Sequence, residues 1–145
     1  MRYLADFSER FSELSFESEL NTEKLGAALG VTGSIVRHWK RGTRSISLAN
    51  ALRIAEHFNC SLEFLIGRTE DRLVFMPQPY LPFYERLRQL MDNRGVTWYR
   101  IVQDGIVSSH NLSVWKNGTF PMLETVIDIA EYFKLTLDQF VGRET

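Results

Sequence analysis

The 145 residues, 44% of them hydrophobic and 24% charged, have the composition of an ordinary globular protein. The formal net charge of −1 excludes a polycation that binds nucleic acid through its total charge alone. No apolar run approaches the roughly 20 residues of a membrane span, and the N-terminus does not resemble a signal peptide. We therefore expect a cytoplasmic protein with no membrane partner.

The first half of the chain predicts five helices and no strand. Phe7, Phe11 and Leu14 recur at helical spacing and mark the first helix. Residues that can cap a helix N-terminus, followed by apolar residues and a terminating glycine, place the other four. In chain order these are TEKLGAALG after Asn21, GSIVRHWK between Thr32 and Gly42, a longer helix after Ser45 or Ser47 with Leu48, Leu52, Ile54 and Ala55 inward, and LEFLIG between Ser61 and Gly67.

The second half predicts the same five helices in the same order. Its first helix is marked by apolar residues at helical spacing, which are Phe83, Leu87, Leu90 and Met91. The other four follow from the same capping and breaking residues. They are WYRIVQD after Thr97, SHNLSVWK between Ser108 and Gly118, ETVIDIAEYF after Pro121, and LDQFVG after Thr136.

An internal repeat underlies this agreement. The motif W-K-x-G-T at residues 39–43 returns at 115–119, 76 residues later, and I-A-E-x-F at 54–58 returns at 129–133, 75 residues later. The one-residue slip falls in the loop after the first motif, where changes of length are tolerated. A repeat of this length predicts two small domains rather than one.

We place the first domain at residues 1–72, a linker at 73–81 and the second domain at 82–145. Prolines at 77, 79 and 82 favour an extended linker. Apolar residues at 73–75 and 80–81 predict that the linker packs on one or both domains. Domains of about 65 residues bury only about 60% of their unfolded surface, so packing on each other or homodimerisation would stabilise both.

The second and third helices of each half have the spacing of a helix-turn-helix. Apolar residues at matching positions are expected to hold the second of these helices across the first and to leave its opposite face free. They are Leu25, Leu29, Val31, Val36 and Trp39 in the first half and Ile101, Val107, Leu112 and Trp115 in the second.

With these residues in place, both halves resemble the lambda-repressor-like, Cro-type (XRE) family of helix-turn-helix domains. The matching segments are LGAALGVTGSIVRHWKRG and IVQDGIVSSHNLSVWKNG, followed by LANALRIAEHFNCSLEFLIG and LETVIDIAEYFKLTLDQFVG. The resemblance covers nearly the whole chain. It implies an all-α protein of two tandem five-helix domains joined by a Pro-containing linker, double-stranded DNA as partner, and a phage- or prophage-type repressor as function.

A recognition helix needs short polar residues at its N-terminus and longer donors further along. In the first domain Arg37 is the best candidate for a bidentate contact to guanine. Lys40, Arg41 and Arg44 lie at and beyond the helix end, where phosphate is the expected target. The full set of candidate DNA-binding residues in this domain is Thr22, Thr32, Gly33, Ser34, Arg37, His38, Lys40, Arg41 and Arg44.

The second domain offers fewer cations on the equivalent face, and two of its residues depart from the family pattern. Ile106 stands where the turn usually has glycine, and Trp98 stands where many members have a glutamine that touches phosphate. Two alternatives stay open: the domain binds DNA as half of a covalent pseudo-dimer, or it serves dimerisation or partner binding, as in an antitoxin or antirepressor. Its candidate DNA-binding residues are Ser108, Ser109, His110, Ser113 and Lys116.

Other kinds of functional site find no support in the sequence. The histidines at 38, 57 and 110 lack the spacing of a metal site, and no nucleophile–base arrangement or phosphate loop is found. Cys60, the only cysteine, is predicted to be a small packing residue. We therefore expect no catalytic residues, no metal, no cofactor and no small-molecule substrate.

Overall fold

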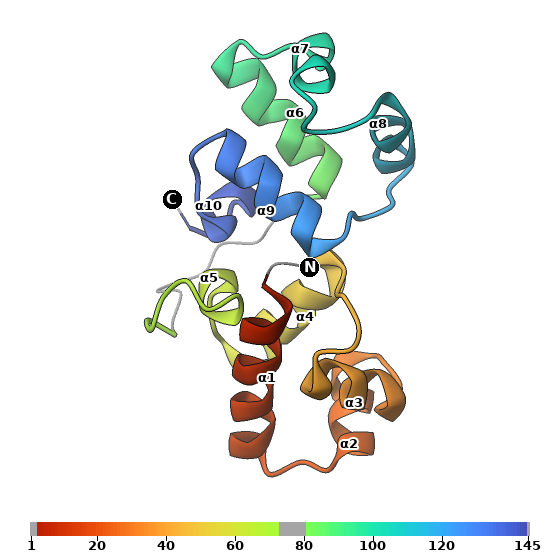
Figure 1. The fold of residues 1–145 in the computed structure, drawn as a ribbon, viewed down its shortest axis with the longest axis vertical. Coiled ribbons are helices and arrows are strands. Elements are labelled where there is room, and N and C mark those ends of the chain that lie inside the picture. The colour runs from red at the N-terminus through yellow and green to blue at the C-terminus, as the bar shows by residue number, and fades with distance from the viewer. Residues whose placement is uncertain (1–2, 73–80, 145) are drawn as a thin grey trace. The chain divides into compact units, whose positions relative to one another are not determined.

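The computed structural model describes residues 3–72 and 81–144, and every regular element in these two ranges is a helix (Figure 1). The predicted all-α class is therefore confirmed. The chain divides into two compact units, which are described separately below. The predicted packing of the linker concerns residues 73–81, which lie outside the described residues apart from Leu81.

The first domain contains the five predicted helices. Asn21, Thr32, Ser47 and Ser61 each accept a hydrogen bond from the backbone N–H three residues further on, so Ser47 rather than Ser45 is the cap of the fourth helix. The last helix is shorter than predicted, because Ile66 already leaves helical geometry. The bounds are α1 (Leu4–Ser18), α2 (Thr22–Leu29), α3 (Gly33–Arg41), α4 (Leu48–Phe58) and α5 (Leu62–Leu65).

An aromatic cluster forms the centre of this domain. The Phe11 ring meets the Trp39 indole edge-on, with centroids 5.6 Å apart, and stacks on Phe7 at 5.7 Å. All three side chains are almost fully buried, and edge-to-face pairs of this kind add to the free energy of apolar burial. Cys60 is fully buried as well, so its predicted role in packing is confirmed. This cluster fixes α3 against α1.

The second domain contains the equivalent five helices. Thr97, Ser108 and Thr136 cap three of them as predicted, the last two through complete capping boxes. The fourth begins at Leu123, one residue earlier than predicted, and the third ends at Lys116, two residues before Gly118. The bounds are α6 (Phe83–Arg94), α7 (Trp98–Gln103), α8 (Ser109–Lys116), α9 (Leu123–Tyr132) and α10 (Leu137–Val141).

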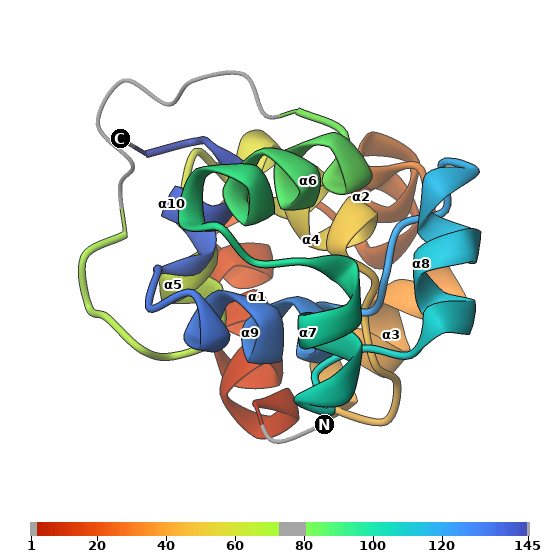
Figure 2. The ribbon, with the colours of Figure 1, turned by 90° about the horizontal axis from the view of Figure 1, so that it is seen from above.

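A buried ion pair distinguishes the core of the second domain. The Arg143 guanidinium donates to the Asp138 carboxylate at 2.9 Å, and the two side chains are only 3% and 1% exposed. The equivalent pair of the first domain, Arg68 and Glu63, is wider at 3.8 Å and more exposed. Each arginine follows its short last helix. In the second domain that helix, α10, lies alongside α6 (Figures 1 and 2).

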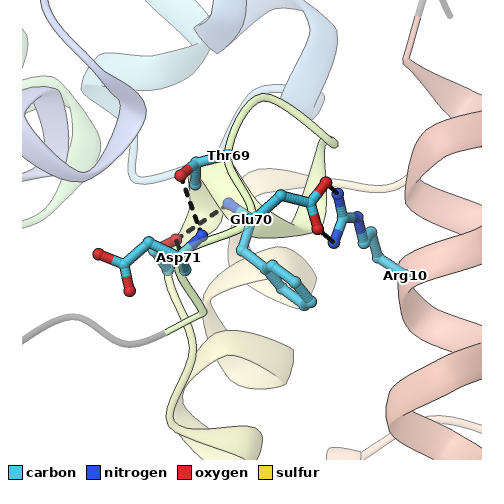
Figure 3. Close-up of polar contacts among 6 residues, drawn as sticks. Arg10, Thr69, Glu70 and Asp71 are labelled. Atoms are coloured by element: carbon cyan, nitrogen blue, oxygen red, sulfur yellow. Dashed lines mark hydrogen bonds and ion pairs between the residues drawn. The ribbon is translucent and has the colours of Figure 1, made fainter.

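Arginines tie the end of the first domain to its first helix. Arg10 forms a two-pronged contact with the Glu70 carboxylate, at 2.9 Å for the shorter bond (Figure 3). Arg72 forms another with Glu17. The two guanidinium groups lie 4.4 Å and 5.2 Å from the centroid of the Phe64 ring, within cation–π distance. The segment 68–72 is therefore part of the packed first domain.

The ion pairs that hold residues 68–72 against α1 depend on pH, because each of them needs an ionised carboxylate. The hydrogen bond from Arg72 lowers the pKa of Glu17 below its ordinary value of 4.5. A carboxylate with a lowered folded-state pKa stabilises the fold above its unfolded pKa, and this contribution is lost as the pH falls through the folded value. The Ser61 N–H donates to the Arg72 carbonyl oxygen at 2.7 Å. Hydrogen exchange of this amide therefore reports whether the end of the segment 68–72 stays packed on the domain.

We expect the Glu17→Gln variant to show less protection of the Ser61 amide against hydrogen exchange than the wild type above about pH 4.5. The wild type should lose this protection only as the pH falls through the lowered folded-state pKa of Glu17, and the variant should change less. Glu56→Gln, which neutralises an exposed carboxylate on α4, is the matched control and should behave as the wild type. Equal loss in all three proteins on acidification would contradict the assignment.

Candidate nucleic-acid interface

Close packing of α2 and α3 builds the helix-turn-helix of the first domain. A Cβ atom at Gly26 would lie 2.7 Å from the carbonyl oxygen of Val31, so only glycine lets α2 approach the turn this closely. Leu25, Leu29, Val36 and Trp39 are buried as predicted. Val31 is half-exposed, so its predicted burial is wrong. It lies in the turn, outside the region where α2 and α3 face each other.

The outer face of α3 carries most of the predicted contact residues. Ser34 and Arg37 are exposed, and Thr32 is exposed while its hydroxyl oxygen accepts the hydrogen bond that caps the helix. Gly33 differs, because it is buried. Thr22, the first residue of α2, is half-buried.

An ion pair on this face was not foreseen from the sequence. Arg37 Nη1 lies 3.1 Å from Glu23 Oε1, and the side chains are 48% and 71% exposed. The Glu23 carboxylate also covers Gly33, since a Cβ there would clash with both carboxylate oxygens. Residues 23 and 37 lie on different helices, and no sequence periodicity connects them. Only the crossing of α2 and α3 brings them together.

The end of α3 is anchored to the rest of the domain. Ser8 of α1 donates to the Lys40 carbonyl oxygen at 2.6 Å. His38 Nδ1 lies 2.8 Å from the Thr43 hydroxyl, which itself donates to the His38 carbonyl oxygen.

Three cations lie at the C-terminal end of α3 or just beyond it. Among the residues that the structure describes, no carboxylate lies within ion-pair distance of Lys40, Arg41 or Arg44. Arg41 and Arg44 are exposed, and Lys40 is half-exposed. The positive charges are therefore not neutralised within the domain and can attract an anionic partner.

The second helix-turn-helix is built differently, because two residues of α2 that shape the following turn have been replaced. Val102 replaces Gly26, and its side chain rules out the same close approach to the turn. Gly105 replaces Leu29, and it takes the left-handed conformation one place earlier than Gly30 does. As a result α7 ends two residues earlier than α2, and α7 and α8 make far less contact with each other than α2 and α3 do.

This looser packing changes what α8 buries. Trp115 is buried as predicted, but Leu112 is half-exposed, so its predicted burial is wrong. The equivalent residue of the first domain, Val36, is fully buried against α2. A groove of about 230 Å³ lies between α6 and α8 and is lined in part by Phe83 and Trp115.

The predicted contact residues of the second domain lie on the outside of this helix. Ser109, His110, Ser113 and Lys116 are exposed. The Ser108 hydroxyl is occupied by the capping box, because it donates to the Asn111 side chain and accepts from the Asn111 N–H.

Aromatic residues take the place of polar ones on α7. The Trp98 indole stacks on the Tyr84 ring with centroids 5.6 Å apart and planes inclined by 6°. Tyr99 beside it is 74% exposed. The equivalent positions of the first domain are Thr22, Ser8 and Glu23, so this face has become aromatic.

Comparison with known families agrees with this geometry. A family model described as helix-turn-helix matches residues 19–65, and a second, described as a helix-turn-helix domain, matches residues 84–143. Neither the curated proteins nor the solved structures contain a significant match to the chain.

No described helix is long and apolar enough to cross a membrane. Within residues 3–72 and 81–144, no group of three His, Cys, Asp or Glu side chains is placed to hold a metal ion.

The tight turn of the first domain is open to a direct test. We expect Gly26→Val to destabilise the first domain by about 1–3 kcal/mol, because the side chain would overpack the turn. Ala27→Val places the same side chain on the neighbouring exposed position and should cost only the lower helix propensity of valine, about 0.5 kcal/mol. Urea titrations followed by circular dichroism measure both. Equal destabilisation by the two variants would show that the close approach is not required.

Proposed function

The chain belongs to the helix-turn-helix family, with two domains of the lambda-repressor-like (XRE) type in tandem, and on this premise we propose that it represses transcription by reading a specific DNA sequence. In general terms the protein is a DNA-binding regulator, since DNA is the partner of such domains. The narrower assignment is a phage- or prophage-type repressor in which α3 enters the major groove. Domains of this type act by binding rather than by catalysis.

One observation supports this proposal above the others. The recognition helix of the first domain ends in Lys40 and Arg41, and Arg44 follows in the loop. None of the three has a carboxylate partner among the described residues. Residues 1–72 contain equal numbers of basic and acidic side chains, so the attraction to DNA must come from this local cluster rather than from net charge. Each phosphate that such a cation neutralises steepens the salt dependence of binding by about 0.9 in log–log slope.

The roles of the remaining residues follow from their reach. The short side chains of Thr32 and Ser34 let the N-terminal part of α3 come close to the bases. Arg37 is long enough to donate two hydrogen bonds to guanine O6 and N7. Thr22, at the start of α2, and the cations at the end of α3 contact phosphate and set the register.

For the second domain we propose dimerisation or binding of a protein partner. The exposed Tyr99 and the stacked Trp98 favour this role over DNA binding, because aromatic side chains are enriched in protein interfaces. A homodimer would supply the second recognition helix that such proteins use, about 34 Å from the first along the DNA. The alternative is a covalent pseudo-dimer in which α8 itself reads the second half-site.

The repressor proposal is tested with the DNA that flanks the protein's own gene. We expect Arg37→Ala to lose about 1–3 kcal/mol on the cognate site and to relax discrimination at one base pair. Arg41→Ala should weaken binding to all sequences and lower the salt slope by about 0.9. Arg88→Ala, an exposed arginine on α6, controls for the loss of one positive charge. Wild-type protein with no sequence preference at any salt concentration would overturn the proposal.

A separate experiment tests whether the second domain dimerises rather than reads DNA. We expect the double variant His110→Ala, Lys116→Ala to keep its DNA affinity within about twofold, because α8 is not the reader under this proposal. Tyr99→Ser, which replaces an exposed aromatic, should lower the molar mass measured by light scattering at micromolar concentration. A tenfold or larger loss of DNA affinity in the double variant would instead assign α8 to the second half-site.

A further inference from the structure

We propose that Glu23 is a positioning residue that determines the specificity of the first domain by directing Arg37 to a base rather than to phosphate. The inference rests on the proposed function, since it concerns how α3 reads DNA. Among the described cations of the candidate face, Arg37 is the only one that forms an ion pair with a carboxylate.

The geometry of the pair leaves Arg37 able to read a base. Glu23 Oε1 accepts a hydrogen bond from Nη1 at 3.1 Å, so one nitrogen of the guanidinium is occupied. A guanidinium has five N–H donors in a rigid plane, and the edge formed by Nε and Nη2 keeps two of them. This edge matches the O6 and N7 acceptors of guanine. The carboxylate therefore restricts the orientation of Arg37 without using its reading edge.

The position of the Glu23 carboxylate also disfavours a contact between Arg37 and a DNA phosphate. It lies over Gly33, the first residue of α3, where the helix dipole stabilises negative charge. The same place would otherwise attract a DNA phosphate. Because Glu23 is 71% exposed, its charge faces an approaching DNA backbone and repels it. An arginine paired in this way gains less from a phosphate than from the neutral acceptors of a base.

A comparison within the chain supports treating these residues as one unit. Glu23, Gly33 and Arg37 correspond to Tyr99, Ser109 and Ser113 in the second domain, so all three differ together. The pair contributes little to folding, because an ion pair between exposed side chains typically adds no more than about 1 kcal/mol. The arrangement is therefore explained better by what α3 binds than by the stability of the domain.

The test compares two DNA duplexes of equal length, the cognate site and a random sequence, each titrated at two salt concentrations. We expect Glu23→Gln to raise affinity for the random duplex about threefold to tenfold and to lower the ratio of cognate to random affinity by a similar factor. Glu13→Gln removes the same charge from an exposed position on α1 and should leave that ratio unchanged within about twofold. Glu23→Asp keeps the charge but shortens the side chain, so it should also lower the ratio.

Each result decides the proposal. An unchanged ratio in both Glu23 variants would overturn it, and so would an equal effect of Glu23→Gln in the Arg37→Ala background, where no arginine remains to be positioned. Loss of the effect in that background supports it. Wild-type protein that shows no preference for the cognate duplex overturns the repressor function itself. Wild-type preference that survives Glu23→Gln overturns only the role of Glu23.

Discussion

The close contact of α2 with the turn before α3, at Gly26, is the constraint on which the proposed DNA-reading face depends. It lets Leu25 and Leu29 cover Val36, and Trp39 then lies against the phenylalanines of α1. With its inner face fixed at these points, α3 has a single orientation, and its outer face presents Ser34 and Arg37 together. Recognition of bases requires such rigidity, because each donor must reach its acceptor without a large loss of side-chain entropy.

The second domain shows what happens when this constraint is relaxed. Val102 keeps α7 away from the turn, and α8 is held mainly through Trp115 on α6. Leu112 remains half-exposed, and a groove opens beside α8. A helix attached in this way is a poorer frame for base contacts but retains an accessible apolar surface. The change in packing and the aromatic residues of α7 thus both support the role in protein binding that we propose for the second domain.

The sequence was sufficient for much of the fold, and the limits of prediction have physical causes. Caps and glycines act through local backbone geometry, so Asn21, Thr32 and Ser108 marked helix starts correctly. The pair of Glu23 with Arg37 could not be predicted, because it depends on how two helices cross. Half-exposure of Leu112 was missed for a related reason, since it follows from a substitution ten residues earlier on another helix. The DNA-contacting roles stay predictions.

Differences between the two copies separate the demands of folding from those of binding. The buried tryptophans and the acid–arginine pairs at the last helices recur, because each copy needs them to close its own core. Residues 23 and 99 occupy equivalent positions and differ, and both are exposed, so the core of neither copy depends on their identity. A linked pair of domains raises the effective concentration of the second site, so even a weak contact made by the second domain would strengthen binding by the first. Under the proposed function, the second copy can therefore lack a DNA-reading face and still contribute to affinity, provided that it keeps a surface able to bind a partner close to the DNA site.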